Sequence, residues 1–240
     1  MYKSAEKGVN RVTWNFTYEG ISPVTTVKYE PIPVTTGQRN SGIQVMPGTY
    51  KVSLSIFSKG ETKELAAPVP FLCKPLNLAT FPSTDLKAKY AWISEASDFS
   101  KSIYATISYT TELMNKTNAV MQAIHETPVA SAEMMKEAER INNELDKIMF
   151  IFNGPAAKAS DEELPPMDLP LSQRLGSMAS ASYGTSGDIT TIAKEQMDIL
   201  KVEFPPILNR VKKAGQDLQN LDKQLDEIKA PWTPGRVPEL

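Results

Sequence analysis

The first third of the chain carries the alternating hydrophobic pattern of β-strands. Apolar and polar side chains alternate in residues 10–18 and again in residues 48–57, the period-2 pattern of a half-buried strand. Pro47-Gly48 and Lys59-Gly60 place turns at the two ends of the second segment. A further strand is expected through "APVPFLCK", residues 67–74.

Two more segments belong to this part. Residues 24–34 are rich in β-branched side chains and predict a strand whose proline-containing end is confined to a sheet edge or a loop. Residues 35–45 predict a turn-rich connector. Short strands separated by turns predict a small antiparallel β-sandwich of immunoglobulin or fibronectin III type over residues 1–75.

After a boundary with two prolines at residues 75–84, the pattern changes to helical periodicity. Apolar side chains recur at steps of three and four from residue 85 to about 126, which predicts one helix about 60 Å long. A second helix is expected at 131–153, a short one at 171–181 and a last long one at 188–229.

These helices predict an antiparallel bundle of three long helices and one short over residues 84–240. Pro205-Pro206 is expected to kink or break the last helix, and the tail "APWTPGRVPEL" cannot be helical. The predicted buried stripe of the second helix is Met135, Ala138, Ile141, Leu145, Ile148 and Phe152. The predicted buried stripe of the last helix is Ile192, Ile199/Leu200, Ile207/Leu208, Val211, Leu218, Leu221, Leu225 and Ile228.

Local polar residues predict how the helices begin. Ser83 or Thr84 is expected to cap the first helix, Ser131 the second and Asp188 the last, because short oxygen-bearing side chains accept hydrogen bonds from the free amides of a first turn. The fold class is therefore α+β with two domains, a sandwich followed by a helical bundle.

Composition narrows the function classes. The net charge is −2, which gives no reason to expect nucleic acid as a partner, and the sequence has no apolar run long enough to span a membrane. Residues 1–75 hold nine Lys and Arg against five Asp and Glu, so the strand-rich part is the basic part. Cys73 is the only cysteine, which excludes an intrachain disulfide and a thiolate metal cluster. Its place in an apolar strand pattern predicts a buried, inert thiol.

Few residues could carry chemistry. His125 is the only histidine, so a metal site would need carboxylates from elsewhere, and its place at a predicted helix C-terminus favours a role in the helix dipole. No G-x-S-x-G elbow accompanies it for a Ser-His-Asp triad, and no Walker A or Rossmann glycine pattern is present.

The acidic residues of the loop at 155–170 are Asp161, Glu162, Glu163 and Asp168. Paired carboxylates hydrolyse glycosides only when they are held rigidly across a cleft, and a proline-rich loop provides no such frame. They are interpreted as a solvated acidic loop. "TSGDITT" matches an Asp-box at Ser186 and Asp188 but lacks its later Gly and Trp, so it is interpreted as a helix start.

The three tryptophans lie in different elements. Trp14 falls in an alternating strand and is interpreted as core rather than as a platform for sugar stacking. Trp92 lies in the first helix. Trp232, in the tail, is expected to dock when the tail folds back, with Arg236 paired to a carboxylate.

Four stretches carry a resemblance to a known group of proteins. They are "GVNRVTWNF", "MPGTYKVSLSIF", "APVPFLCKPLNLATFP" and "APWTPGRVPEL", in this order. Together they resemble the C-terminal region of large exported bacterial proteins of the BNR/Asp-box, sialidase-like or sortilin-type propeller glycosyl hydrolase group. The resemblance covers nearly the whole chain and rests mostly on the strands and the tail.

The resemblance implies that a propeller, with any substrate pocket, precedes these residues. It carries no catalytic, cofactor-binding or metal-binding residue onto this chain. The residues it matches are fold determinants: Gly8, Asn10, Arg11, Trp14, Pro47, Gly48, Tyr50, Val52, Leu54, Trp232, Pro234, Gly235 and Arg236.

The hypothesis that follows is a non-catalytic accessory region that supports or spaces an upstream propeller of the same polypeptide, with no cofactor of its own. The alternative is a carbohydrate- or protein-binding module, and an independent enzyme is the least favoured reading. The N-terminus lacks the apolar segment of a signal peptide, so an export signal is expected upstream, with a periplasmic, outer-membrane-associated or extracellular location. Some apolar positions on the helices are doubled, such as Leu113/Met114 and Ile199/Leu200. If the three long helices do not cover these positions themselves, a homodimer or the propeller is expected to cover them.

Overall fold

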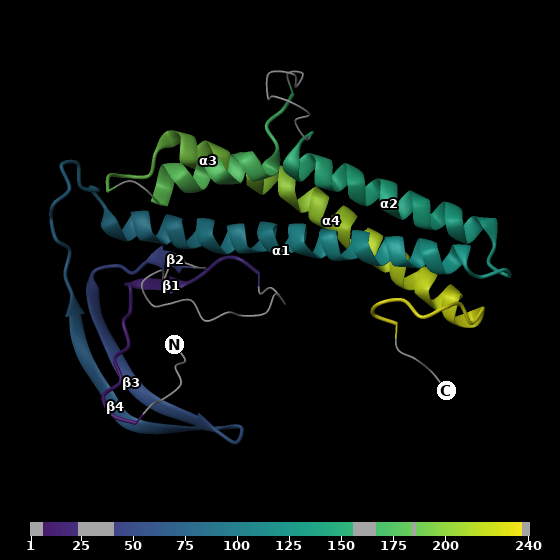
Figure 1. Cartoon of the computed structure of the whole chain (residues 1–240). Coiled ribbons are helices and arrows are strands. Elements are labelled where there is room, and N and C mark those ends of the chain that lie inside the picture. Colours follow the sequence, from purple (N-terminus) through teal and green to yellow (C-terminus); the bar gives the residue numbers. More distant parts are fainter. Residues whose placement is uncertain (1–6, 24–40, 156–166, 184–185, 237–240) are drawn as a thin grey trace. The chain divides into compact units, whose positions relative to one another are not determined.

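The computed structural model describes residues 7–23, 41–155, 167–183 and 186–236. These residues form a helix-rich α+β fold (Figure 1). Its elements are β1 (Thr17–Glu19), β2 (Ser41–Gln44), β3 (Gly48–Ser58), β4 (Glu61–Cys73), α1 (Leu86–His125), α2 (Ala132–Asn153), α3 (Leu171–Tyr183) and α4 (Thr191–Glu227).

The chain divides into two compact units, which are described separately. The strand unit holds the four strands, the connector after β4, the start of α1 up to Ser94, and residues 186–188. The helix unit holds α1 from Glu95 onward, α2, α3, α4 and the C-terminal tail.

The predicted sandwich is wrong. The described strands form two separate two-stranded antiparallel sheets, β1–β2 and β3–β4. β2 lies in the segment that was predicted as a connector, and the strand predicted at residues 24–34 lies outside the described residues. The alternation of residues 48–57 correctly predicts a strand with one face to bury, but the pattern does not say what buries that face.

β3 and β4 form a long hairpin. The two-residue turn at Lys59 and Gly60 has positive φ at both residues, 52° and 84°, as the tight turns that match strand twist require. This turn confirms the prediction. Tyr50 pairs with Phe71 and Val52 with Val69, and the register shifts on both sides of Leu54 show that β4 carries bulges.

The strand unit has a small core. Trp14 packs edge-on against Tyr50 and Phe71, with ring centroids 5.6 and 6.0 Å away, so its prediction as a packed residue is supported. In the described residues before α1, Val45 is the one fully buried side chain. Cys73 is only half-buried, which corrects the prediction of a buried thiol.

The helix unit has a continuous apolar interior, which follows helical periodicity. In α2 the buried side chains are those predicted from Ala138 onward, but the first is Met134 rather than Met135. The residue four positions before Ala138 faces the core, not the residue three positions before it. In α4 the predicted Ile192 is 61% exposed, and the buried residues are Ala193, Met197, Leu200, Phe204, Ile207, Val211, Ala214, Gly215, Leu218, Leu221, Asp222 and Leu225.

Pro205 and Pro206 lie inside α4, which is continuous over 37 residues. The predicted break is therefore wrong. The two prolines, and Lys201 and Val202 four residues before them, are exposed, so the carbonyls that lose a helical donor face solvent, which can supply one instead.

Hydroxyl side chains form a buried stripe along α1. Each hydroxyl donates to the carbonyl oxygen four residues earlier, which satisfies it inside the helix. The residues are Ser100, Thr106, Thr110 and Thr117. Thr127, two residues after the helix ends, makes the same kind of bond to the Ala123 carbonyl oxygen. Small side chains let neighbouring helices approach closely, and a Cβ added at Gly215 of α4 would lie 2.7 Å from the Tyr109 hydroxyl of α1.

The helix caps were predicted in part. Ser131 caps α2 by accepting from the Met134 amide. α1 is capped by Asp85, whose carboxylate accepts from the Ala88 amide at 2.9 Å, and α4 by Thr190. Ser83, Thr84 and Asp188 were the wrong assignments, because these residues bond to one another instead.

Candidate functional site

The residues that sequence reasoning weighed for chemistry do not come together. His125 is exposed at the end of α1 and Asp168 is exposed before α3. Asp161, Glu162 and Glu163 lie outside the described residues. Within residues 7–23, 41–155, 167–183 and 186–236, no three His, Cys, Asp or Glu side chains are placed to hold a metal ion.

Asp188 joins two parts of the strand unit that are far apart in sequence. Its carboxylate accepts from the Ser83 hydroxyl and from the Thr84 amide and hydroxyl, the latter two at 2.9 and 2.8 Å. These hydrogen bonds hold the pKa of Asp188 below its ordinary value. Nearby, the buried Lys89 ammonium donates to the Gly187 carbonyl oxygen, and burial lowers the pKa of Lys89. The cluster fixes residues 186–188 to the start of α1 and offers no group to a substrate.

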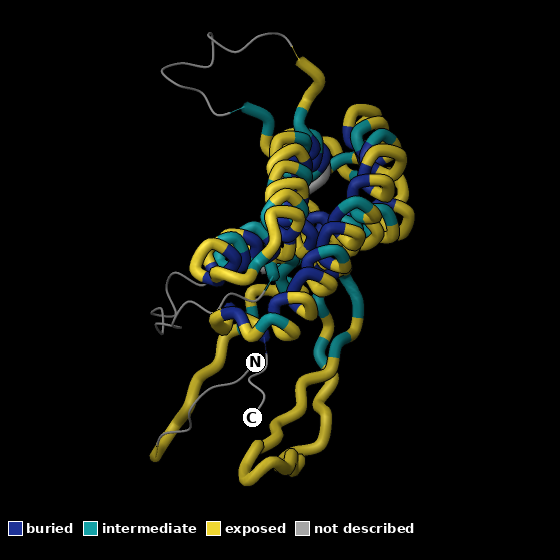
Figure 2. The backbone as a smooth tube through the Cα atoms, turned by 90° about the vertical axis from the view of Figure 1, so that its right-hand side faces the viewer, coloured by how far each residue is buried: buried dark blue, intermediate teal, exposed yellow. Residues whose placement is uncertain are grey.

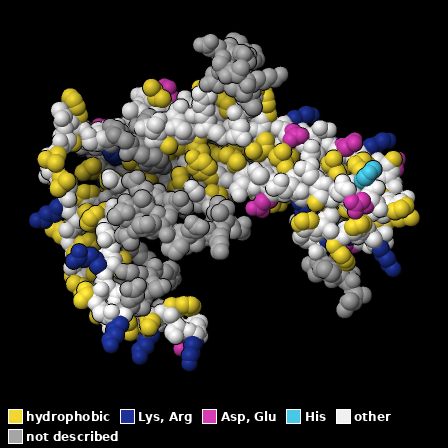
Figure 3. Space-filling model, in the orientation of Figure 1, with side chains coloured by type: hydrophobic (Ala, Val, Ile, Leu, Met, Phe, Trp, Pro, Cys, Tyr) yellow, Lys and Arg dark blue, Asp and Glu magenta, His cyan; other side chains and the backbone are white. Residues whose placement is uncertain are grey.

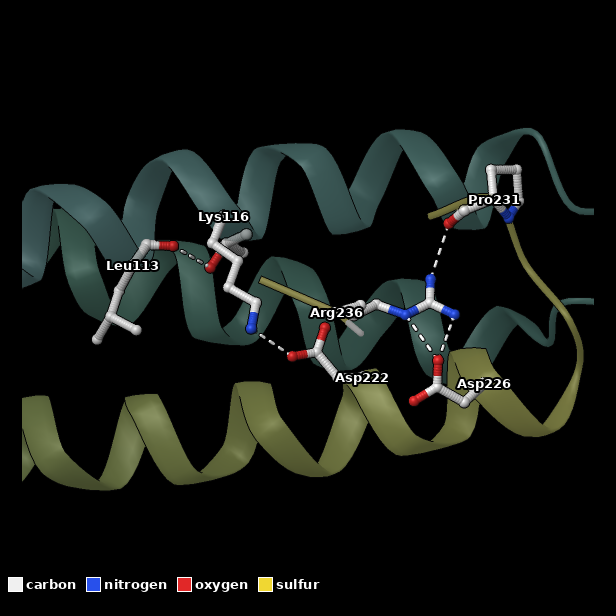
Figure 4. A network of polar contacts seen from close by, with 7 residues as sticks. Leu113, Lys116, Asp222, Asp226, Pro231 and Arg236 are labelled. Carbon is white, nitrogen blue, oxygen red and sulfur yellow. Dashed lines mark hydrogen bonds and ion pairs between the residues drawn. The ribbon is translucent and has the colours of Figure 1, made fainter. Parts of the chain in front are cut away.

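The C-terminal tail forms a second polar cluster, in the helix unit (Figure 4). The Arg236 side chain is only 2% exposed. Its Nε and Nη2 donate to Asp226 Oδ1 at 2.8 and 2.6 Å, and its Nη1 donates to the Pro231 carbonyl oxygen at 2.7 Å. The guanidinium lies 4.9 Å from the centre of the Trp232 ring, a cation–π geometry. The predicted pairing of Arg236 with a carboxylate is confirmed.

Beside it, Lys116 of α1 pairs with Asp222 of α4. A side chain at Gly235 would approach the Lys116 ammonium to 3.5 Å, so the tail lies directly over this ion pair. Each cation of the two pairs faces its own carboxylate, which leaves no net charge to attract a ligand. We call residues 230–236 the tail clasp, because its contacts join the tail to α4 and place it over α1.

Among the described residues of the strand unit, the β3–β4 hairpin has an apolar face that no other element covers fully. In an antiparallel pair, opposed residues share a face, so Tyr50, Val52 and Leu54 lie on one face with Phe71, Val69 and Ala66. Trp14 covers Tyr50 and Phe71 at the base of this face. Farther along, the aliphatic side chains are between 47% and 59% exposed. We call these four residues the open face: Val52, Leu54, Ile56 and Val69.

Figure 2 shows this difference between the units, since both strands of the hairpin are exposed along most of their length while buried residues gather in the helices. The connector after β4 continues the apolar surface. Leu76, Leu78 and Phe81 are 84%, 83% and 79% exposed. Within the described part of the strand unit, apolar side chains therefore outnumber what its small core can cover.

The hairpin carries one more basic than acidic side chain, with Lys51, Lys59 and Lys63 against Glu61 and Glu64. Figure 3 shows dark blue side chains along this part of the molecule. At the base, burial and the neighbouring Tyr18 hydroxyl raise the pKa of Tyr50 to about 12. Tyr50 therefore stays a neutral hydrogen-bond donor, and its hydroxyl donates to the Met46 carbonyl oxygen.

A hollow of about 400 Å³ lies on the helix unit. Its lining comes from α2 alone, and two of its charged groups are already used in contacts with α4. Arg140 pairs with Asp217, and Glu144 pairs with Arg210 at 2.7 Å. These ion pairs lower the pKa of Glu144. The hollow is a surface between charged side chains rather than a reaction pocket.

Comparisons with protein-family models, with curated proteins and with solved structures found no match to this chain. Among the residues that the structure describes, no helix combines the length and the apolar character needed to cross a membrane. Sequence reasoning found the pairing of Arg236 with a carboxylate in the tail clasp, but Trp232, which was expected to dock, is 51% exposed. It also missed the open face, although the signal was present. The alternation of Val52, Leu54 and Ile56 indicates a face that another element covers. The prediction covered it with a second sheet layer, which the described strands do not form.

Proposed function

We propose that this chain is a non-catalytic accessory region of a larger exported protein, and that its open face packs against a β-rich domain, a propeller, of the same polypeptide. One observation carries the proposal. The hairpin has the amphipathic pattern of a half-buried sheet, yet Val52, Leu54, Ile56 and Val69 have no cover among the described residues.

An uncovered hairpin of this kind is energetically incomplete. A two-stranded hairpin is marginally stable in water, and a third strand or a packed face is needed for independent stability. Full burial of a Val, Leu or Ile side chain contributes about 1.5–3 kcal/mol. Because the four side chains are about half exposed, covering them adds about 1 kcal/mol each.

The side chains favour a folded protein sheet as the partner. The four residues of the open face are aliphatic, with Lys63 opposite Ile56 at its outer end. Stacking on a sugar would need a row of exposed aromatic rings on this face, whereas Trp14 and Tyr50 pack against each other. Stacked sheets interlock such aliphatic faces about 10 Å apart. The resemblance to propeller-containing proteins supports the same partner, because its matched residues Val52 and Leu54 lie on the open face.

The test uses charge on one face of β3. Val52→Lys with Leu54→Lys places two ammonium groups on the open face, and Ser53→Lys with Ser55→Lys places them on the opposite face as a matched control. Both double variants are made in the natural polypeptide that carries this chain, and the hairpin is probed by limited proteolysis.

We expect rapid cleavage near the Lys59-Gly60 turn in the open-face variant and slow cleavage in the control, because only the first expels the hairpin from its partner. Equal cleavage of the two variants would refute the docking of the open face. A natural polypeptide without a β-rich domain would refute the choice of partner.

A further inference from the structure

The two outer edges of the β3–β4 hairpin differ. β4 carries Pro68 and Pro70. It also bulges on both sides of Ala66, the residue that lies opposite Leu54. Prolines and bulges are the features that keep a strand edge from pairing with another chain. β3 has neither in its 11 residues, and in the described part of the chain no other strand pairs with it.

Pro70 shows which backbone groups of β3 face outward. It lies opposite Lys51, and a proline has no N–H to exchange across the pair. Opposed residues alternate between hydrogen-bonded and non-hydrogen-bonded pairs, so Lys51 takes the non-bonded position and directs its N–H and C=O to the open edge. By the same alternation, the amide groups of Ser53 and Ser55 also face that edge.

The side chains of β3 are nearly symmetric about Leu54. The order Val52-Ser53-Leu54-Ser55-Ile56 places a β-branched residue and a serine on each side. We propose that two copies of this chain pair antiparallel along β3, with a two-fold axis at Leu54, and form one four-stranded sheet.

In this register, the central residues of the two β3 strands lie opposite side chains of the same kind. Val52 meets Ile56 of the second copy, Leu54 meets Leu54, and Ser53 meets Ser55. Lys51 meets Phe57 rather than another lysine, so the basic hairpins do not place like charges opposite each other. An interface of this kind is self-complementary and closes as a dimer.

A second copy accounts for the open β3 edge better than an unrelated strand does. The near-symmetry of the β3 side chains about Leu54 makes the strand complementary to itself, and only a two-fold partner uses that property. The pairing uses the outer edge of β3 and leaves the open face uncovered. It does not rest on the proposed docking to a β-rich domain, and either contact can fail without the other.

Cysteine cross-linking tests the register directly. In the Cys73→Ser background, Leu54→Cys places two thiols across the axis at a Cα separation of about 4.5–5.5 Å, within the range of a disulfide. Ser58→Cys is the matched control on the same strand. In this register the two Ser58 positions lie eight residues apart along the strand, about 27 Å.

After mild oxidation, we expect the Leu54→Cys protein to form a covalent dimer on a non-reducing gel and the Ser58→Cys protein to stay monomeric. Equal cross-linking of both variants, or none at either, would overturn the proposal. The second result includes the case in which another segment of the same chain occupies the edge.

Solution mass provides a second measurement that does not depend on oxidation. Size-exclusion chromatography with light scattering should give a dimer for the unsubstituted chain. It should give a monomer for Ser53→Pro with Ser55→Pro, which removes two outward donors but no donor to β4. An unchanged circular dichroism spectrum controls for folding. A monomer in the unsubstituted chain, or a dimer in both, would overturn the proposal.

Discussion

Replacing Arg236 with Ala should release the tail clasp. The guanidinium is 2% exposed and makes three donor contacts, two to one oxygen of Asp226 and one to the Pro231 carbonyl. Hydrogen bonds to charged groups contribute about 1.5–3 kcal/mol each. The two contacts to Asp226 share an acceptor, and that carboxylate is 45% exposed, so water replaces much of their strength.

With that discount, the Asp226 contact and the Pro231 contact contribute about 1–1.5 kcal/mol each, and the Trp232 stacking about 0.5 kcal/mol. The expected loss in the free energy of unfolding is about 3 kcal/mol for Arg236→Ala. Arg236→Lys keeps the charge but loses the planar fork, and should cost about half as much.

Urea unfolding followed by circular dichroism at helical wavelengths measures this loss, because the clasp belongs to the helix unit. Asp226→Asn, alone and combined with Arg236→Ala, gives the coupling between the two side chains. Lys223→Ala, an exposed position on α4, controls for the loss of a surface cation. The reasoning is refuted if Arg236→Ala costs no more than Lys223→Ala.

The other predictions address caps, packing and charge. Gly154→Ala should lower the free energy of unfolding by about 1–2 kcal/mol, because φ is +71° there and a Cβ would lie 2.8 Å from Pro170 Cγ. Gly176→Ala lies in open space within α3 and should raise the free energy of unfolding by about 0.5–1 kcal/mol. Both are read from urea midpoints. Ile148→Ala, at a fully buried position of α2, should cost about 2–5 kcal/mol. Ile192→Ala, at a position of α4 that is 61% exposed, should cost less than about 0.5 kcal/mol. Similar losses at both positions would contradict the assignment of buried and exposed faces to the two helices. The lowered pKa of Asp188 means that its contribution is present above about pH 4 and is lost as the pH falls through its folded value. Denaturation at a series of pH values should show the unsubstituted chain to be more stable than Asp188→Asn above about pH 4, with this difference shrinking as the pH falls; a difference that does not change with pH would contradict the assignment.

The helices could be predicted from the sequence because their periodicity is long and local. The periodicity predicted all four helical segments, and the second was predicted to end at residue 153, where α2 ends. One error came from a position where two helical steps compete, Met134 against Met135, and the capping residues of α1 and α4 were also misassigned. Pro205 and Pro206 were misleading because packing along the rest of α4 can offset the cost of proline in a helix. Both lie on the exposed side of α4, where solvent reaches the carbonyls that lose a donor.

The strands could be predicted only locally. The turn at Lys59-Gly60 and the alternation about Leu54 gave the hairpin, because neighbouring residues determine both. The number of layers depends on contacts between distant segments, and alternation is the same whether a face is buried by its own domain or by a partner. Asp188 shows the same limit: its best local role was to cap α4, and its partners Ser83 and Thr84 lie about a hundred residues away in sequence.

Hydroxyl-radical footprinting of the open face tests the central claim most directly. The labelling of Val52, Leu54, Ile56 and Val69 is compared between this chain alone and the natural polypeptide that carries it, with exposed Val202 of α4 as the reference. Pairing along the edge of β3 does not cover the face, so it does not affect the comparison. The account predicts strong labelling in the chain alone and loss of that labelling in the natural polypeptide. Equal labelling in the two would contradict it.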